Sequence, residues 1–420
     1  MINSGDTAWV LASAALVLFM TPGLAIFYGG MVRAKSALNM MMMSFSAIGV
    51  TTIIWVLYGY SLAFGKSHGG LIGSLDHIGL AKTLDQVTGA EGHQIPTLAF
   101  AMFQLTFAII TVALLSGAIA DRAKFSSWII FVVIWITLVY IPIAHWAFAS
   151  QSGEGGWIID HLGALDFAGG TVVEINSGAA ALALAIVLGK REGFKQESMR
   201  PHNMPLVLLG AGMLWFGWFG FNAGSALSAG SLAATAMINT QIATAAAAMS
   251  WVLLERFRDG KPTTLGIASG AVAGAVAITP ACGFVNPLGA LVIGLIAGAL
   301  SAFAVSRKYK WGYDDSLDVV GVHGVGGILG MVAIGFLATT TANSAGGLGL
   351  LTHGSSALLE RQLIAIAATG AFSFAATWLI ATIISKTTGF RANREDELTG
   401  LDTTYHAESA YDISGNANRY

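Results

Sequence analysis

The 420-residue chain carries little charge and almost no cysteine. Only 10% of its residues are Asp, Glu, Lys or Arg, whereas 55% are hydrophobic. A soluble domain has roughly 25% charged residues, so this chain lacks the polar surface that would cover a water-soluble globule. The single cysteine, Cys282, excludes an intrachain disulfide and a thiolate metal cage, and a net charge of −2 offers no basic surface to nucleic acid. These absences favour a protein whose solvent is lipid.

Long apolar segments occupy most of the chain. A window of about 19 residues finds eleven segments long enough to cross a bilayer as helices, and each exceeds the roughly 9 to 11 residues of a barrel strand. Their approximate limits are 8–31, 37–64, 96–120, 125–148, 167–188, 205–224, 232–254, 264–282, 286–305, 317–338 and 358–385. We therefore expect an all-α polytopic membrane protein. The first segment lacks the basic start of a secretory signal, which predicts that it is retained as a span.

The basic residues fix an orientation for these spans. If the connections are numbered alternately, 18 of the 21 basic residues fall on one side, and the other side holds only Lys66, Lys82 and Arg361. Cytoplasmic loops carry the excess of Lys and Arg, so the pattern predicts an outside N-terminus and a cytoplasmic C-terminus. The 52 glycines are consistent with close packing of membrane helices.

Two spans share a motif of buried ionisable groups. In the fifth, Glu174 follows Asp166 by eight residues, and at the tenth His323 follows Asp315 by eight. Both motifs continue into glycine-rich sequence, and the two spans cross in opposite directions. This predicts two inverted five-helix repeats, about 8–188 and 205–338, followed by a last helix at about 358–385 and a cytoplasmic tail over 386–420. Eight helical residues rise about 12 Å, which puts Glu174 and His323 near the midplane, where the repeat brings them together.

Other interpretations of these residues remain open. Asp166 and Asp315 can each cap a helix N-terminus, His323 can be an interhelical hydrogen-bonding group, and His145 is expected to have a structural or rim role. A carboxylate at the depth of Glu174 has no packing reason to be there, so it is a functional candidate. A metal site needs three or four ligands, and two buried side chains do not provide them. We expect no metal, no cofactor and no enzymatic activity.

Five long motifs, in order along the chain, resemble the ammonium transporter family (Amt/Mep/Rh), and most closely its bacterial Amt members. They are residues 19–30 (FMTPGLAIFYGG), 166–173 (DFAGGTVV), 216–225 (FGWFGFNAGS), 321–327 (GVHGVGG), and 394–402 (REDELTGLD) with 408–411 (ESAY). The resemblance covers nearly the whole chain. It implies eleven spans, an outside N-terminus and an inverted repeat, in agreement with the pattern above.

The resemblance also implies site residues and partners. It implies a homotrimer with one pore per subunit, in which Phe107 and Phe221 are stacked as a gate. Ser225 is similar to the serine of the outer ammonium site, and Asp166 resembles the aspartate that supports that site without touching the ion. Packing in the core or against lipid is the alternative for the aromatic residues. Bacterial members are blocked by P-II-type signal proteins, so such a partner is expected at the cytoplasmic face.

Two positions depart from the family pattern. Glu174 replaces the first pore histidine, which leaves His323 as the only histidine of the pair, and Phe148 stands where the outer site usually has tryptophan. Phenylalanine offers a weaker cation–π face, so the outer site is expected to bind ammonium less tightly. The expected function is ammonium transport across a bacterial inner membrane, with the proton relayed by Glu174 and His323. A passive channel for neutral ammonia or another gas, or an ammonium sensor, remains the alternative.

Overall fold

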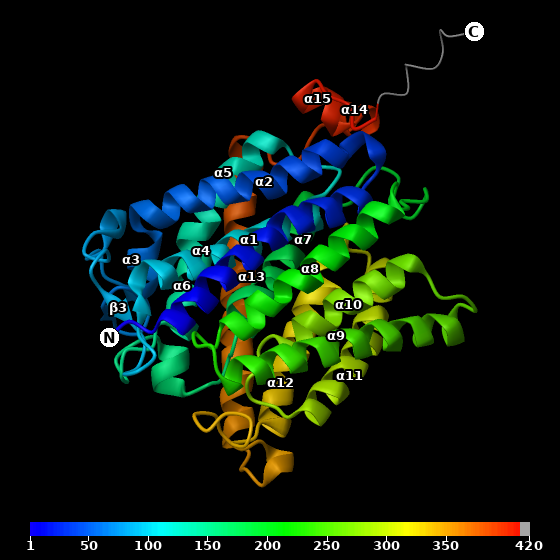
Figure 1. Cartoon of the computed structure of the whole chain (residues 1–420). Coiled ribbons are helices and arrows are strands. Elements are labelled where there is room, and N and C mark those ends of the chain that lie inside the picture. Colours follow the sequence, from blue (N-terminus) through cyan, green and yellow to red (C-terminus); the bar gives the residue numbers. More distant parts are fainter. Residues whose placement is uncertain (412–420) are drawn as a thin grey trace.

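The computed structural model describes residues 1–411, which are almost entirely helical (Figure 1). Ten helical segments in this range are long and apolar enough to cross a membrane. They are Ser4–Met31, Ala34–Phe64, Thr97–Ile119, Phe125–Phe148, Gly170–Leu188, Met204–Gly224, Ser231–Arg258, Pro287–Trp311, Val320–Leu337 and Ala357–Thr387. The predicted all-α polytopic architecture is therefore confirmed in its main features.

One of the eleven expected spans is shorter than predicted. Residues 264–282 were expected to span, but the helix α10 covers only Thr264–Ile278, or 15 residues. Such a helix rises about 22 Å, less than the roughly 30 Å of a hydrocarbon core. Turns occupy residues 279–284, and α11 begins at Pro287 and runs to Trp311. The closely spaced glycines of this region hid the break from a hydropathy window.

The spans are built from α-helices that several π-helical turns interrupt. The long elements are α1 (Ser4–Met31), α2 (Ala37–Ile54), α4 (Thr97–Leu115), α5 (Phe125–Trp135), α6 (Ile141–Phe148), α7 (Asn176–Leu188), α8 (Met204–Gly224), α9 (Ser231–Arg258), α10, α11, α12 (Val325–Leu337) and α13 (Ala357–Thr387). The π-helical turns are η2 (Trp55–Gly59), η5 (Ile136–Tyr140), η6 (Trp157–Leu162), η7 (Gly170–Ile175) and η8 (Val320–Gly324). The short helices are α3 (Tyr60–Phe64), α14 (Arg394–Thr399) and α15 (Leu401–His406), with 3₁₀ turns η1 (Ala34–Ser36), η3 (Ile78–Leu80), η4 (Ser116–Ile119) and η9 (Leu350–Thr352).

Polar residues at the interfaces define where the helices start. The side chain of Asn3 accepts the Asp6 N–H at the start of α1, and Asn203 accepts the Leu206 N–H at the start of α8. Asn286 caps α11 in the same way, directly before Pro287. These caps satisfy backbone donors that a helix leaves free at its first turn, and proline at the first helical position sacrifices no hydrogen bond.

The long connection between α3 and α4 contains two small antiparallel sheets. Strands β1 (Ser67–His68) and β2 (Ile72–Gly73) pair with each other, as do β3 (Val87–Thr88) and β4 (Ile95–Pro96). Strands of two residues give no alternating pattern that could have predicted them.

Close backbone contact brings α7 against η8 beside the core of the bundle. A Cβ atom on Gly178 would lie 2.2 Å from the Cα of Gly324, so α7 cannot carry a side chain at this crossing. Elsewhere α1 packs along α8, and α9 packs against both α10 and α11. Large apolar side chains such as Ile53, Leu57 and Phe257 stay exposed on the outside of the bundle, as lipid-facing residues do.

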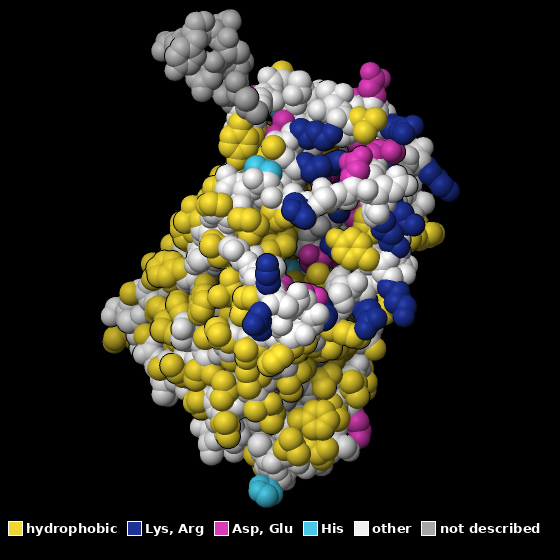
Figure 2. All heavy atoms as spheres, turned by 90° about the vertical axis from the view of Figure 1, so that its right-hand side faces the viewer, with side chains coloured by type: hydrophobic (Ala, Val, Ile, Leu, Met, Phe, Trp, Pro, Cys, Tyr) yellow, Lys and Arg dark blue, Asp and Glu magenta, His cyan; other side chains and the backbone are white. Residues whose placement is uncertain are grey.

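The C-terminal tail folds back on one end of the bundle, next to the connection between α1 and α2 (Figure 1). Both carboxylate oxygens of Asp402 accept N–H groups at the start of α2, those of Leu38 and Asn39, at 3.0 and 2.8 Å. Figure 2 shows Lys and Arg side chains gathered around a hollow at the end that carries this tail, whereas apolar side chains cover the rest of that face.

Arginine–aspartate pairs join the connections at this end. Arg191 donates to Asp314 through Nε and Nη2, at 2.9 and 2.8 Å, and also contacts Asp121 at 3.4 Å. Arg33 reaches the same oxygen of Asp121 at 3.3 Å. Burial raises the pKa of Asp314, but its hydrogen bonds to Arg191 and the charges of Arg122 and Arg191 outweigh burial and hold that pKa below its ordinary value. The carboxyl group of Asp314 thus stays ionised in the folded protein at neutral pH.

The crossing at Gly178 generates a prediction of stability. Gly178→Ala should lower the free energy of unfolding by about 1–3 kcal/mol, because the added methyl group forces α7 and η8 apart. The measurement is the thermal unfolding midpoint of the purified protein in detergent. Gly49→Ala is the control, since nothing lies within 4 Å of a Cβ at that position in α2. Equal midpoints for the two variants would contradict the packing argument.

The network around Arg191 generates a prediction of acid sensitivity. The folded-state pKa of Asp314 lies below its unfolded value, so its contribution to stability is present above about pH 3.9 and is lost as the pH falls through the folded pKa. Arg191→Met should cost about 3–5 kcal/mol at pH 7, because it leaves the buried carboxylate of Asp314 without its arginine partner, and should weaken the acid dependence. Unfolding midpoints measured across this pH range test both effects.

Arg258→Met is the control for the loss of an arginine. Arg258 pairs with Asp259, but the two side chains are 43% and 48% exposed. Exposed ion pairs contribute about 0–1 kcal/mol, so the midpoint of this variant should hardly change. An Arg191→Met midpoint as high as that of Arg258→Met would mean that the buried network does not hold this end together.

Candidate functional site

The two central ionisable residues lie in corresponding π-helical turns. Glu174 belongs to η7, which leads into α7, and His323 belongs to η8, which leads into α12. A π-helical turn inserts one residue into a helix and often accompanies a functional site. The sequence could not predict these turns, because their residues have the same apolar, glycine-rich character as the helices that follow.

Glu174 and His323 contact each other directly. Nδ1 of His323 lies 2.7 Å from Oε2 of Glu174, and the side chains are only 5% and 1% exposed. The predicted proximity of these two residues is thus present. Gly327 makes room for the carboxylate, because a Cβ there would lie 2.7 Å from Cβ of Glu174. Within residues 1–411, no side chain or backbone group is bonded to Nε2 of His323, so this atom is free to meet a small solute.

Each turn is preceded by an aspartate that caps it. Asp166 accepts the N–H groups of Gly169, Gly170 and Thr171 at 2.7–2.8 Å, together with the Thr171 hydroxyl at 2.5 Å. Asp315 accepts the N–H of Val320 at 2.7 Å. The capping interpretation of both residues therefore agrees with the geometry.

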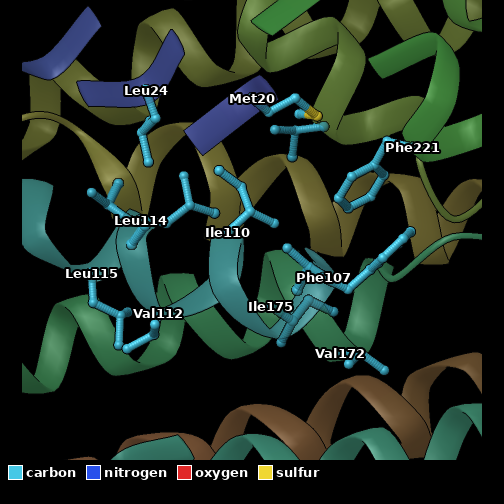
Figure 3. Packing of buried hydrophobic residues seen from close by; sticks show 14 of the residues in the cluster. Met20, Leu24, Phe107, Ile110, Val112, Leu114, Leu115, Val172, Ile175 and Phe221 are labelled. Atoms are coloured by element: carbon cyan, nitrogen blue, oxygen red, sulfur yellow. The ribbon is translucent and has the colours of Figure 1, made fainter. Parts of the chain in front are cut away.

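Several aromatic side chains form a cluster around Phe107. Its ring stacks on that of Phe221, with centroids 4.2 Å apart and an interplanar angle of 29°. Phe148 meets Phe107 edge-on at 6.2 Å, and Phe103 does so at 4.9 Å. Figure 3 shows Phe107 from α4 and Phe221 from α8 next to each other on the right of the view, with the apolar residues Ile110 and Leu114 to their left. The predicted stack of two phenylalanines is present.

Ser225 follows the last turn of α8, four residues after Phe221. Its hydroxyl donates to the backbone carbonyl of Phe221 at 2.8 Å and is half-buried. Because its hydrogen is used within the helix, the oxygen retains lone pairs that can accept a hydrogen bond. Ser225 is thus linked to the aromatic stack through the backbone of Phe221.

A narrow cavity of about 10 Å³ connects the stacked rings with the ionisable pair. This volume is close to the roughly 10–15 Å³ that one water molecule needs. Its lining is apolar except at Glu174 and His323 and the indole of Trp218, and comprises Met20, Leu24, Phe27, Ile110, Leu114, Val173, Glu174, Leu214, Trp218, Phe221, Val272 and His323. An uncharged molecule of this size fits such a space, whereas a bare cation would lose its hydration without compensation.

Sequence reasoning missed Trp218 as part of this lining. Its indole N–H donates to the Thr279 hydroxyl at 2.9 Å, and the same hydroxyl donates to Asn222 at 3.2 Å. The ring packs 5.9 Å from that of Phe221. Trp218 lies inside one of the motifs quoted above, but nothing in the sequence indicated that its partner would be a threonine from the turn after α10.

The remaining candidates have structural surroundings. His145 is fully buried, with Nδ1 2.8 Å from the carbonyl of Ala63 and Nε2 2.8 Å from the hydroxyl of Ser67. This agrees with the structural role that the sequence suggested. In the described range, 1–411, no group of three or more His, Cys, Asp and Glu residues is arranged to hold a metal ion.

Comparison with known proteins places this geometry in a family. The chain matches the model of the Ammonium Transporter Family over residues 8–411. An ammonium transporter of Mycobacterium tuberculosis is 52% identical over 434 aligned positions, which cover 98% of this chain and 91% of that protein. The crystal structure of Mep2 from Candida albicans superposes with a TM-score of 0.87 at 34% identity, covering 94% of this chain and 88% of the other.

A further solved structure, named Sensor Amt Protein, superposes with a TM-score of 0.88 at 29% identity and covers 96% of this chain and 98% of its own. The family model matches nearly the entire length, and the close sequence relatives are named as transporters rather than enzymes. The chain is a multi-pass membrane protein that belongs to the ammonium transporter family.

Proposed function

We propose that this protein transports ammonium through a pore within its own helical bundle. The observation that carries the proposal is the contact between Glu174 and His323 in an apolar, water-sized cavity directly beyond the Phe107–Phe221 stack. Such a path suits neutral ammonia, and its ionisable pair offers a separate place for the proton. Membership of the ammonium transporter family supports the same substrate.

Recruitment takes place at the outer mouth. Ammonium has four N–H donors and potassium has none, so a hydrogen-bond acceptor and aromatic faces distinguish two ions of similar size. The oxygen of Ser225 is the acceptor, because its own hydrogen is engaged by Phe221. Phe107 and Phe148 provide the aromatic surfaces, and the carboxyl group of Asp166 stabilises the cation at a distance.

Ammonium loses its proton at the stacked rings, and the proton passes to the Glu174–His323 pair on the inner side of the rings. A cation beyond them would be desolvated at a cost of several kcal/mol, whereas neutral ammonia is not penalised in this way. Phe107 and Phe221 therefore act as the gate. Glu174 and His323 relay the proton through the hydrogen bond that they share. This pair is more polar than two neutral imidazoles, so we expect an altered pH dependence and a less strict exclusion of other ions.

The membrane arrangement is proposed on the same grounds. We infer eleven spans, α10 and the turns after it together making the eighth, with the N-terminus outside and the tail in the cytoplasm, because 18 of 21 basic residues fall on the tail side. Corresponding sequences of acidic cap, π-helical turn and α-helix at Asp166 and Asp315 support two inverted repeats over about 8–188 and 205–338, followed by the helix at 358–385. The tail, 386–420, extends past the described residues after Tyr411.

Assembly and regulation are proposed by analogy with the family. We infer a homotrimer in a bacterial inner membrane, and a P-II-type protein as a partner at the basic, tail-bearing face of Figure 2. Ammonium sensing is a second candidate function, because the Sensor Amt Protein has the same fold. A sensor would bind ammonium without sustained transport, and a passive gas channel would conduct ammonia without charge.

A current measurement separates these functions. The protein reconstituted in liposomes on a solid-supported membrane should give a sustained current after an ammonium pulse and none after an equal potassium pulse. Current with both ions would mean that the Glu174 pore is unselective. Electrical silence, with ammonia-dependent alkalinisation inside the liposomes, would favour the gas channel, and silence in both assays would favour the sensor.

Substitutions of Glu174 test the proton relay. Glu174→Ala should reduce the ammonium current by at least about tenfold, since general acid–base groups contribute roughly 10²–10⁴-fold to proton transfer. Glu174→His should remain folded and conduct ammonium more selectively than the parent, because two neutral imidazoles leave no fixed charge in the cavity. Current must be normalised to the amount of folded protein. A Glu174→Ala variant that transports as well as the parent would disprove the relay.

A further inference from the structure

The segment between Phe148 and the turn η6 is folded around one aspartate. Asp160, in η6, accepts the N–H groups of Gln151, Gly153 and Gly155 with Oδ2 at 2.8, 3.1 and 2.8 Å. Its Oδ1 accepts the Ser150 hydroxyl at 2.8 Å. Burial alone would raise the pKa of Asp160, but these bonds outweigh it and lower that pKa, so the carboxylate is ionised.

Two glycines allow this segment to fold tightly. A Cβ on Gly155 would lie 1.9 Å from the carbonyl oxygen of Ala149, and one on Gly156 would lie 1.9 Å from that of His145. The N–H of Gly156 donates to Ala149 at 2.7 Å. The chain therefore turns back on the last turn of α6 immediately after Phe148, and the connection from Phe148 to Asp160 is tightly folded.

The segment is also fastened to the neighbouring connection. Gln151 donates to the carbonyl of Gly65 at 2.7 Å and accepts the N–H of Ser67 at 3.0 Å. Ser67 in turn bonds to His145, one turn before Phe148 in α6. Residues on both sides of Phe148 are thus held to the start of the α3–α4 connection.

Phe148 has no polar atom with which to fix its own position. Trp146, two residues earlier, is anchored by its indole N–H, which donates to Leu71 at 2.9 Å. The ring of Phe148 is half-buried, meets Phe107 edge-on at a centroid distance of 6.2 Å, and packs against the apolar core. The ring therefore takes its position from this packing and from the backbone of residues 148–156.

We propose that Asp160 is a positioning residue that holds Phe148 against Phe107 and so sets the affinity of the outer mouth for ammonium. The inference rests on the proposed outer site and adds to it a residue that does not contact the ion. It also explains how a smaller ring, lacking an N–H group, can serve at this position. A cation–π contact depends on the distance between the ion and the ring face, so a displaced ring loses part of its attraction.

The test compares Asp160→Ala with Asp160→Asn in proteoliposomes. Asp160→Ala removes the carboxylate that accepts these four hydrogen bonds. It should raise the half-saturating ammonium concentration about three- to tenfold, as for the loss of one cation–π contact, while the maximal current per folded protein stays near that of the parent. Asp160→Asn should restore most of the affinity, because its amide oxygen can accept the same N–H groups. Asp76→Ala is the control for lost negative charge, since Asp76 is exposed and bonds only to Ser74 at 2.6 Å.

Phe148→Ala completes a double-mutant cycle. If Asp160 acts through Phe148, Asp160→Ala should not raise the half-saturating ammonium concentration further when Phe148→Ala is already present. An unchanged half-saturation in Phe148→Ala itself would overturn the proposed outer site. If Phe148→Ala raises the half-saturating ammonium concentration as expected, three results would still overturn the role of Asp160 alone. These are additive effects of the two substitutions, an unchanged half-saturating concentration in Asp160→Ala, and an increase in Asp76→Ala equal to that in Asp160→Ala.

Discussion

The hydrogen bond between Glu174 and His323 is the constraint that the packing around it must satisfy. Each group alone would be costly inside an apolar bundle, and a pair is tolerated only when its geometry is good. The 2.7 Å contact requires two spans to approach at their backbones, which Gly178 and Gly324 permit. It also requires the carboxylate and the imidazole to point inward at matching depth, which the turns η7 and η8 provide. Those turns need caps, and Asp166 and Asp315 supply them.

The sequence predicted the parts of this arrangement that depend on composition and spacing. Apolar length located ten membrane helices within residues 1–411, and the eight-residue spacing of Asp166 with Glu174 and of Asp315 with His323 indicated which residues would meet. The resemblance to a family supplied the stack of Phe107 on Phe221. The spans and the ionisable pair could be predicted because apolar length, or a charge in lipid, is recognisable in the sequence without knowledge of the residues that it contacts in the fold.

What the sequence could not predict depends on partners far apart in the chain. The π-helical turns have no composition of their own, and the break after Ile278 is hidden among small residues. The fixing of Trp218 by Thr279 joins positions 61 residues apart, and the anchoring of Gln151 to Gly65 and Ser67 joins positions more than 80 apart. Polar residues in loops are common, so only the fold shows that Asp160 collects three backbone N–H groups rather than facing solvent.

Carboxylates near the two ends of the bundle differ in their partners, and this difference bears on the direction from which a cation is drawn in the proposed mechanism. Asp314 and Asp121 at the tail-bearing end pair with arginines, and Asp318 pairs with Lys308, although Asp402 at this end is held by backbone N–H groups. Asp166 and Asp160 at the opposite end are held by neutral N–H and hydroxyl groups. Such groups, unlike arginine or lysine, bring no positive charge to the carboxylate. Under the proposed mechanism, a cation would therefore be stabilised at the mouth beside Phe107 and Phe148 before it meets an apolar path that its neutral form can follow.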